Sequence, residues 1–248
     1  MTPPNLTAPR RTGQWIGLGG GVVVLGVIIA LVVRWIAGIG GPGPEPPASE
    51  DPGGEATTIV CPDKPAEVPR AEHPDDDRVY GGKLSYPKLG SPWSDVRTTE
   101  NRIPFGRDIA EQDITIHTND DPYDRHWSSW VIGVFVGELY AGDGFYSPEE
   151  GSRIVNKCIL GGFYDWTTVG AETLRSEAYT LDGREGWITE TNLTFDIRGL
   201  PTTSELQIVI IVKTSDMSSS IFFASIPNDA VQYRPDVDRA IAGLRVVG

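Results

Sequence analysis

The longest apolar stretch of the chain runs from residue 15 to residue 33, nineteen positions without a charged side chain. An α-helix rises about 1.5 Å per residue, so this stretch would span roughly 28 Å, close to the thickness of the hydrocarbon core of a bilayer. Trp15 and Trp35 flank it where an aromatic belt would lie, and Arg34 can reach the interface from its end. The pattern predicts a transmembrane signal anchor over residues 15–36.

Two regions of different composition follow the apolar stretch. Residues 37–60 consist largely of Gly, Pro and acidic side chains, with too little apolar surface to offset the entropy lost on ordering, so they are predicted to form a disordered linker. Residues 61–248 are long enough to bury the core of one domain.

Within this domain, apolar residues recur with the period of strands and of helices. Ser147, followed by Pro148 and Glu150, has the pattern of a helix N-terminus, and an apolar stripe runs from there to Gly161-Gly162. A second helix is predicted over 235–246. Strands are expected at 83–86, 109–118, 130–139, 175–181, 186–197, 205–214 and 220–225. Two helices and a mostly antiparallel sheet of about six strands give an α+β domain.

The order of these elements resembles that of the PsbP-like fold and, more closely, of the LpqN-like secreted domains of actinobacteria. The resemblance is carried by the Asp182-Gly183 turn followed by Trp187, by the strands at Leu206–Val212 and Ile221–Ser225, and by the closing helix with Val237, Ile241 and Leu244. LpqN-like proteins are typically lipoproteins, whereas this chain has an apolar helix instead. The fold serves unrelated binding and accessory roles, so the resemblance implies no activity.

The distribution of charge predicts how the chain crosses the membrane. Residues 1–14 carry Arg10 and Arg11 and no acid, whereas all 34 Asp and Glu follow the apolar stretch. Positive flanks stay cytoplasmic, so we expect a cytoplasmic tail over 1–14 and an extracytoplasmic domain at the cell membrane. A cleaved secretory signal is the alternative, although no A-x-A site ends the stretch. Gly17 and Gly21 have the spacing of a self-associating helix, but glycine is also common in membrane spans, and the choice stays open.

Cys61 and Cys158 are the only two cysteines. In an oxidising compartment they are expected to form a disulfide. The alternative is two separate thiols, with Cys158 acting as a small apolar residue of its helix.

The sequence contains no motif of catalysis, of a metal site or of a cofactor. The cluster of His117, His126 and neighbouring acids around Asp121-Pro122 is more typical of a solvated turn. No catalytic residue, metal ligand or cofactor is therefore assigned.

Aromatic side chains beside loops are the candidate binding residues: Trp93, Trp127, Trp130, Tyr140, Phe145, Tyr146 and Trp166. We predict a binding groove at Trp127, Trp130, Phe145 and Tyr146, although most aromatic residues belong to a core. The net charge of −13 disfavours nucleic acid as a partner and permits cationic ligands. The sequence thus favours a membrane-anchored domain that binds a protein or small molecule, with an envelope hydrolase or transferase as the alternative.

Overall fold

The computed structural model describes residues 61, 71–99, 106–120, 127–140, 145, 147–216 and 218–248. The predicted cytoplasmic tail, membrane anchor and linker, over residues 1–60, lie outside these ranges, so the structure leaves them as predictions. Within the described part, none of the helices combines the length and the apolar composition needed to cross a bilayer.

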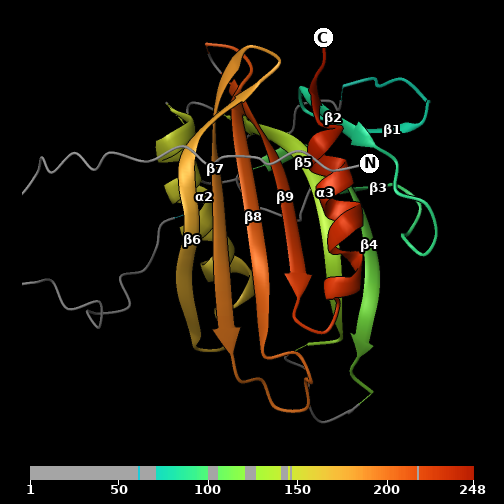
Figure 1. Ribbon diagram of the computed structural model, residues 1–248, viewed down its shortest axis with the longest axis vertical. Helices are drawn as coiled ribbons and strands as arrows, with labels where there is room; N and C mark the ends of the chain where they lie inside the picture. Colours follow the sequence, from blue (N-terminus) through green and yellow to red (C-terminus); the bar gives the residue numbers. More distant parts are fainter. Residues whose placement is uncertain are drawn as a thin grey trace, which may run out of the picture. The chain divides into compact units, whose positions relative to one another are not determined.

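A seven-stranded sheet forms the centre of the domain (Figure 1). Every neighbouring pair in it is antiparallel. The strands, in spatial order, are β3 (Arg97–Thr99), β4 (Gly106–Thr118), β5 (Ser129–Tyr140), β9 (Ser218–Pro227), β8 (Ser204–Lys213), β7 (Arg184–Phe195) and β6 (Val169–Leu181). The three middle strands, β5, β9 and β8, are almost continuously apolar because both of their faces are covered.

A smaller antiparallel sheet packs on one face of the large one. It has the order β1 (Arg78–Gly81), β2 (Leu84–Pro87) and β10 (Arg245–Val246). Arg78 holds its parts together, because its guanidinium donates to Ser85 O at 2.8 Å and to Gly243 O at 2.7 Å. Because β2 pairs with both β1 and β10, it joins the first and the last strand of the domain.

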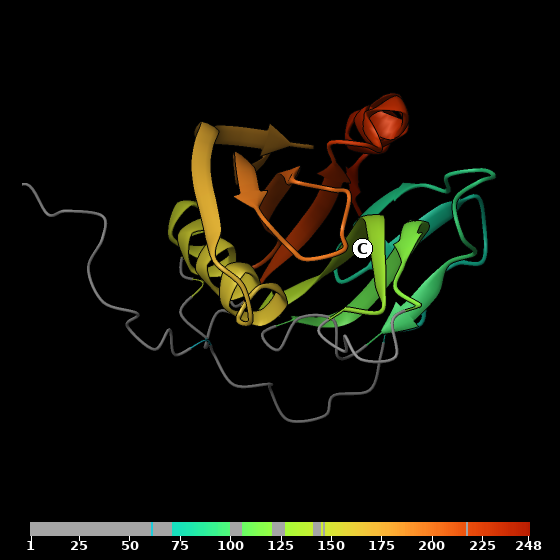
Figure 2. The same ribbon diagram turned by 90° about the horizontal axis from the view of Figure 1, so that it is seen from below.

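The two α-helices lie on opposite faces of the large sheet, as the view along the strands shows (Figure 2). Helix α2 (Pro148–Phe163) begins as the sequence predicts, with the Ser147 hydroxyl accepting a hydrogen bond from Glu150 N at 3.2 Å. The short 3₁₀ helix η2 (Val231–Tyr233) leads into α3 (Arg234–Ala242).

Each face of the sheet has its own apolar core. Helix α3 and the small sheet cover the first core, in which Tyr86 and Phe222 meet edge to face. Helix α2 covers the second, in which Phe135 and Phe223 stack with ring centres 4.7 Å apart. A third cluster of aromatic side chains lies beyond the C-terminal end of α2.

The α+β class, the two helices and the mostly antiparallel sheet agree with the prediction from sequence. The number of strands is larger than expected, because β1, β3 and β10 were not foreseen. Helix α3 also ends at Ala242 rather than near residue 246, and Arg245–Val246 instead extends the small sheet. Helix α2 continues through Gly161 and Gly162 to Phe163 before it ends.

Cys61 and Cys158 form a disulfide, with their Cα atoms 5.5 Å apart. The bridge that the sequence predicts is therefore confirmed. It joins the first described residue of the domain to the middle of α2, where Cys158 is buried among the apolar side chains of the second core.

Candidate functional site

A pocket of about 460 Å³ opens on the α2 face of the large sheet, beyond the C-terminal end of that helix. Its floor is formed where small residues face each other across β5 and β9, because Gly133 pairs with Ser225 in the strand register. A Cβ atom at Gly133 would meet no other atom within 4 Å. The sheet thus leaves room at this point that larger side chains would fill.

Aromatic side chains surround this floor. Phe135 and Phe223, the next pair of β5 and β9 on the same face of the sheet, line the pocket where it borders the core beneath α2, to which they belong. The other wall comes from the last turn of α2, the segment after it, and the segment that opens β5. Its aromatic members are Phe163, Tyr164, Trp166, Trp127 and Trp130.

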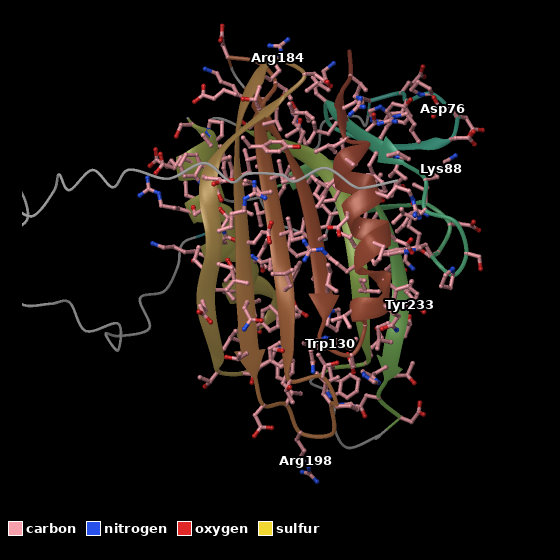
Figure 3. The ribbon with its side chains drawn as sticks, in the orientation of Figure 1. Asp76, Lys88, Trp130, Arg184, Arg198 and Tyr233 are labelled. Carbon is pink, nitrogen blue, oxygen red and sulfur yellow. A yellow bond between two sulfur atoms is a disulfide. The ribbon has the colours of Figure 1, made fainter. Side chains whose placement is uncertain are left out.

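Ring contacts to neighbouring elements hold the Trp130 side chain in the wall of the pocket. Its ring centre lies 5.2 Å from that of Phe195 on β7 and 6.1 Å from that of Tyr164. Figure 3 shows Trp130 at the end of the sheet where the turn of Arg198 also lies, opposite to the hairpin of Arg184. Trp127 is only 8% exposed, and its indole Nε1 has no hydrogen-bond partner among the described residues.

Glu205 is the most unusual polar group of the pocket. It comes from the beginning of β8, and the side chain is buried against the hydroxyl of Tyr164, which donates a hydrogen bond to Glu205 Oε1. Burial raises the pKa of the Glu205 carboxyl to about 7, although the hydrogen bond from Tyr164 opposes part of this increase. Near neutral pH this carboxyl can therefore both accept and release a proton.

Glu111 on β4 lines the pocket from another side. In contrast to Glu205, it has a cationic partner, because the Arg97 guanidinium on β3 lies 3.3 Å from Glu111 Oε1 and also pairs with Asp113. The charge of Glu111 is thus shared with an arginine, whereas Glu205 has only neutral donors.

The structure separates the four residues of the predicted groove. Trp127 and Trp130 line the pocket. Phe145 does not, because it is 2% exposed and packs against Gly151 in the core beneath α2. Tyr146 lies outside the described residues.

Several residues of the pocket were not found by sequence reasoning. Glu205 stands at the start of an apolar strand, where a carboxylate usually faces water, so nothing in the pattern marks it as buried. Phe163 and Tyr164 come just after Gly161-Gly162, where the sequence predicts the end of the helix, so nothing marks them as the wall of a pocket. A signal for the floor did exist, since Gly133 is one of two glycines in the largely apolar central strand β5.

Other polar clusters of the domain have structural partners. His117 lies 2.5 Å from Asp229, which also accepts a hydrogen bond from the buried Thr202, and His73 lies 2.7 Å from Asp108. In the part of the chain that the structure describes, no group of three or more His, Cys, Asp or Glu side chains could hold a metal ion.

Comparison with known proteins gives a resemblance of backbone only. No family model and no curated protein sequence matches this chain. Its fold is similar to that of cyanobacterial PsbP (CyanoP) from Synechocystis sp. PCC 6803. That match has a TM-score of 0.44 and 11% identity, and it covers 72% of this chain and 98% of the other.

A protein of unknown function from Pseudomonas aeruginosa is similar over 64% of this chain and 94% of its own length, with a TM-score of 0.33 and 7% identity. At such identities the resemblance concerns the fold alone. The PsbP-like arrangement agrees with the prediction from sequence, whereas the closer resemblance to LpqN-like domains stays a prediction.

Proposed function

We propose that this chain is a single-pass membrane protein whose extracytoplasmic domain binds a small molecule of the cell envelope in the aromatic pocket. The observation that supports binding is the pocket itself, about 460 Å³ in volume with aromatic walls and two buried carboxyls, those of Glu111 and Glu205. Small-molecule sites commonly have this size, with apolar walls and few polar groups. We also infer, from the order of its elements, that the domain is a relative of the LpqN-like domains.

Filling the pocket tests this proposal. In Gly133→Val the new side chain would occupy the space above the floor, since nothing lies within 4 Å of the position of its Cβ. We expect compounds that raise the melting temperature of the full-length chain in a thermal-shift screen to lose this effect in Gly133→Val. Gly90→Val is the matched control, because Gly90 also has no neighbour within 4 Å but lies away from the pocket. Hits that stabilise both variants equally would contradict the proposed site.

The membrane arrangement is tested separately. The predicted anchor over 15–36 and the arginines before it support an N-terminus inside the cell and a domain outside. Protease added to intact cells should therefore degrade the domain while an epitope tag placed before residue 15 is protected. Protection of the domain until the cells are lysed would reverse the arrangement.

A hydrolase or transferase of the envelope is the second candidate function, and Glu205 is the observation that favours it. A carboxyl with a pKa of about 7 suits general acid–base catalysis at neutral pH. The described lining of the pocket, however, contains no His, Cys or Lys to complete a nucleophilic site. A compound that binds and is recovered chemically unchanged supports a binding protein, whereas its conversion by the wild type but not by Glu205→Gln would support the enzyme.

A further inference from the structure

The charged groups of the pocket all have one sign. Among the described residues that line it, the ionisable side chains are Glu111, Glu205 and Tyr164, and there is no Lys, Arg or His. An anionic ligand would therefore meet two carboxylates in the described lining, of which Glu111 is paired with Arg97. Such a lining disfavours phosphate and carboxylate compounds as ligands.

Glu205 is the acid that a ligand could neutralise. Its hydrogen-bond partner, Tyr164, is a neutral donor, and Glu205 forms no ion pair within the described part of the chain. An ionised carboxylate in an apolar site is costly unless a positive charge is near it. Glu111 needs such a partner less, because Arg97 already provides one.

The aromatic walls provide a second attraction for positive charge. The faces of tryptophan and tyrosine rings are negative and attract ammonium groups, most strongly where water is excluded. Trp127, Trp130, Tyr164 and Trp166 supply four such rings around one pocket. The chain as a whole carries a net charge of −13, which also raises the concentration of cations near its surface.

Resting on the proposed binding function, we propose that the ligand is an organic cation, an amine or quaternary ammonium compound held between the aromatic walls with its charge toward Glu205. A neutral ligand of the same shape would keep the apolar contacts and lose the attraction to the carboxylate. The cationic ligand should therefore bind with higher affinity than the neutral one, and this difference in affinity can be measured.

Choline and its neutral isostere 3,3-dimethylbutan-1-ol make this comparison at nearly constant shape. The full-length chain, kept in a polyoxyethylene detergent that carries no ammonium group and no sugar, is titrated with each compound while its indole ¹⁵N–H signals are recorded. We expect choline to bind at least tenfold more tightly than the alcohol and to shift the signals of Trp127 and Trp130. These signals are assigned by Trp127→Phe and Trp130→Phe.

Glu205→Gln keeps the shape of the side chain and removes its charge. We expect the affinity for choline to fall at least tenfold in this variant, with the affinity for the alcohol unchanged. Glu177→Gln on the exposed strand β6 is the matched control, since it removes an acid that lies outside the pocket. An equal loss in both variants would show a general effect of net charge and would overturn the role of Glu205.

The pH dependence of choline binding provides an independent test of the role of the Glu205 charge. Choline does not titrate between pH 6 and pH 8. The neighbours of the Glu205 carboxyl are Tyr164, from the segment after α2, and the indole of Trp130, and the other carboxyl of the described lining is that of Glu111 on β4. A carboxyl with a pKa of about 7 is roughly one tenth ionised at pH 6 and nine tenths ionised at pH 8. The affinity for choline should therefore rise by about ninefold over this range and stay constant in Glu205→Gln.

The outcomes distinguish this inference from the proposed function. Equal binding of choline and the alcohol, lost in Gly133→Val, would overturn the cationic ligand and leave a binding pocket. If a neutral disaccharide such as maltose bound more tightly than choline, the cationic ligand would also be overturned and the binding pocket would remain. No shift with choline overturns the inference, and the binding function is then decided by the Gly133→Val screen.

Discussion

The side chain of Glu205 makes the stability of the fold depend on pH. Its pKa is about 7 in the folded chain, against an ordinary value of 4.5, because burial disfavours the ionised form. Between these two pH values the folded chain holds a proton that the unfolded chain has released. The free energy of unfolding contributed by this group therefore falls as the pH rises from about 4.5 to about 7, by about 3 kcal/mol in all.

Glu205→Gln should remove this dependence. Relative to the wild type, the variant is expected to gain about 2–3 kcal/mol in free energy of unfolding when the pH is changed from 5 to 8. Urea unfolding at both pH values measures this, and other titrating groups cancel in the difference between the two proteins. A difference that is the same at both pH values would show that the carboxyl is ionised or solvated in the folded chain.

The contact between β1 and β5 depends on the absence of a side chain at Gly81. A Cβ atom there would lie 2.2 Å from Val136 O and 2.8 Å from Asp108 O, and both are backbone atoms that cannot rotate away. Gly81→Ala should lower the free energy of unfolding by more than about 2 kcal/mol, because the small sheet must move off the large one.

Gly90→Ala is the matched control for this contact. No atom lies within 4 Å of its added Cβ, so the change in stability should stay within about 0.5 kcal/mol. Chemical denaturation of both variants measures the difference. A similar stability of the two would mean that β1 does not lie against β5 as described.

The long elements could be predicted from sequence because each has a local signal. Asp182 and Gly183 have φ values of +49° and +76°, which fits the hairpin expected from this dipeptide, and Ser147 caps α2 as predicted. Strands β1, β3 and β10 have only two to four residues, too few to show a period. Their positions are set by contacts with distant parts of the chain, such as that between Arg78 and Gly243.

The pocket was predictable only in part, for the same reason. Trp127 and Trp130 stand out as aromatic residues next to a loop, and both line it. Glu205 reaches it only because β8 lies in the sheet beside β9 and because α2 ends where Tyr164 can cover the carboxyl. No local pattern in the sequence contains this tertiary arrangement.

At the scale of the whole molecule, the disulfide links parts that are 97 positions apart in sequence. The loss of freedom in the unfolded chain gives such a bridge a stabilisation of about 4–5 kcal/mol in the chain-entropy model. Cys61→Ala should lower the free energy of unfolding by up to this amount and leave Cys158 as a small apolar side chain in the core.

A reducing agent provides the control for this prediction. It should lower the stability of the wild type by a similar amount and have no effect on Cys61→Ala, as measured by thermal or urea unfolding. A wild type that is insensitive to reduction would show that the bridge constrains the unfolded chain less than its loop length suggests.

The same bridge decides where a mechanical load enters the fold. A pull on the segment before Cys61 is transmitted through the sulfur atoms to α2, and the sixteen residues between Cys61 and β1 carry none of it. After reduction the force would instead reach the fold through β1 and peel this strand from the small sheet. In single-molecule pulling from the N-terminus, reduction should therefore lower the force at which the domain begins to unfold.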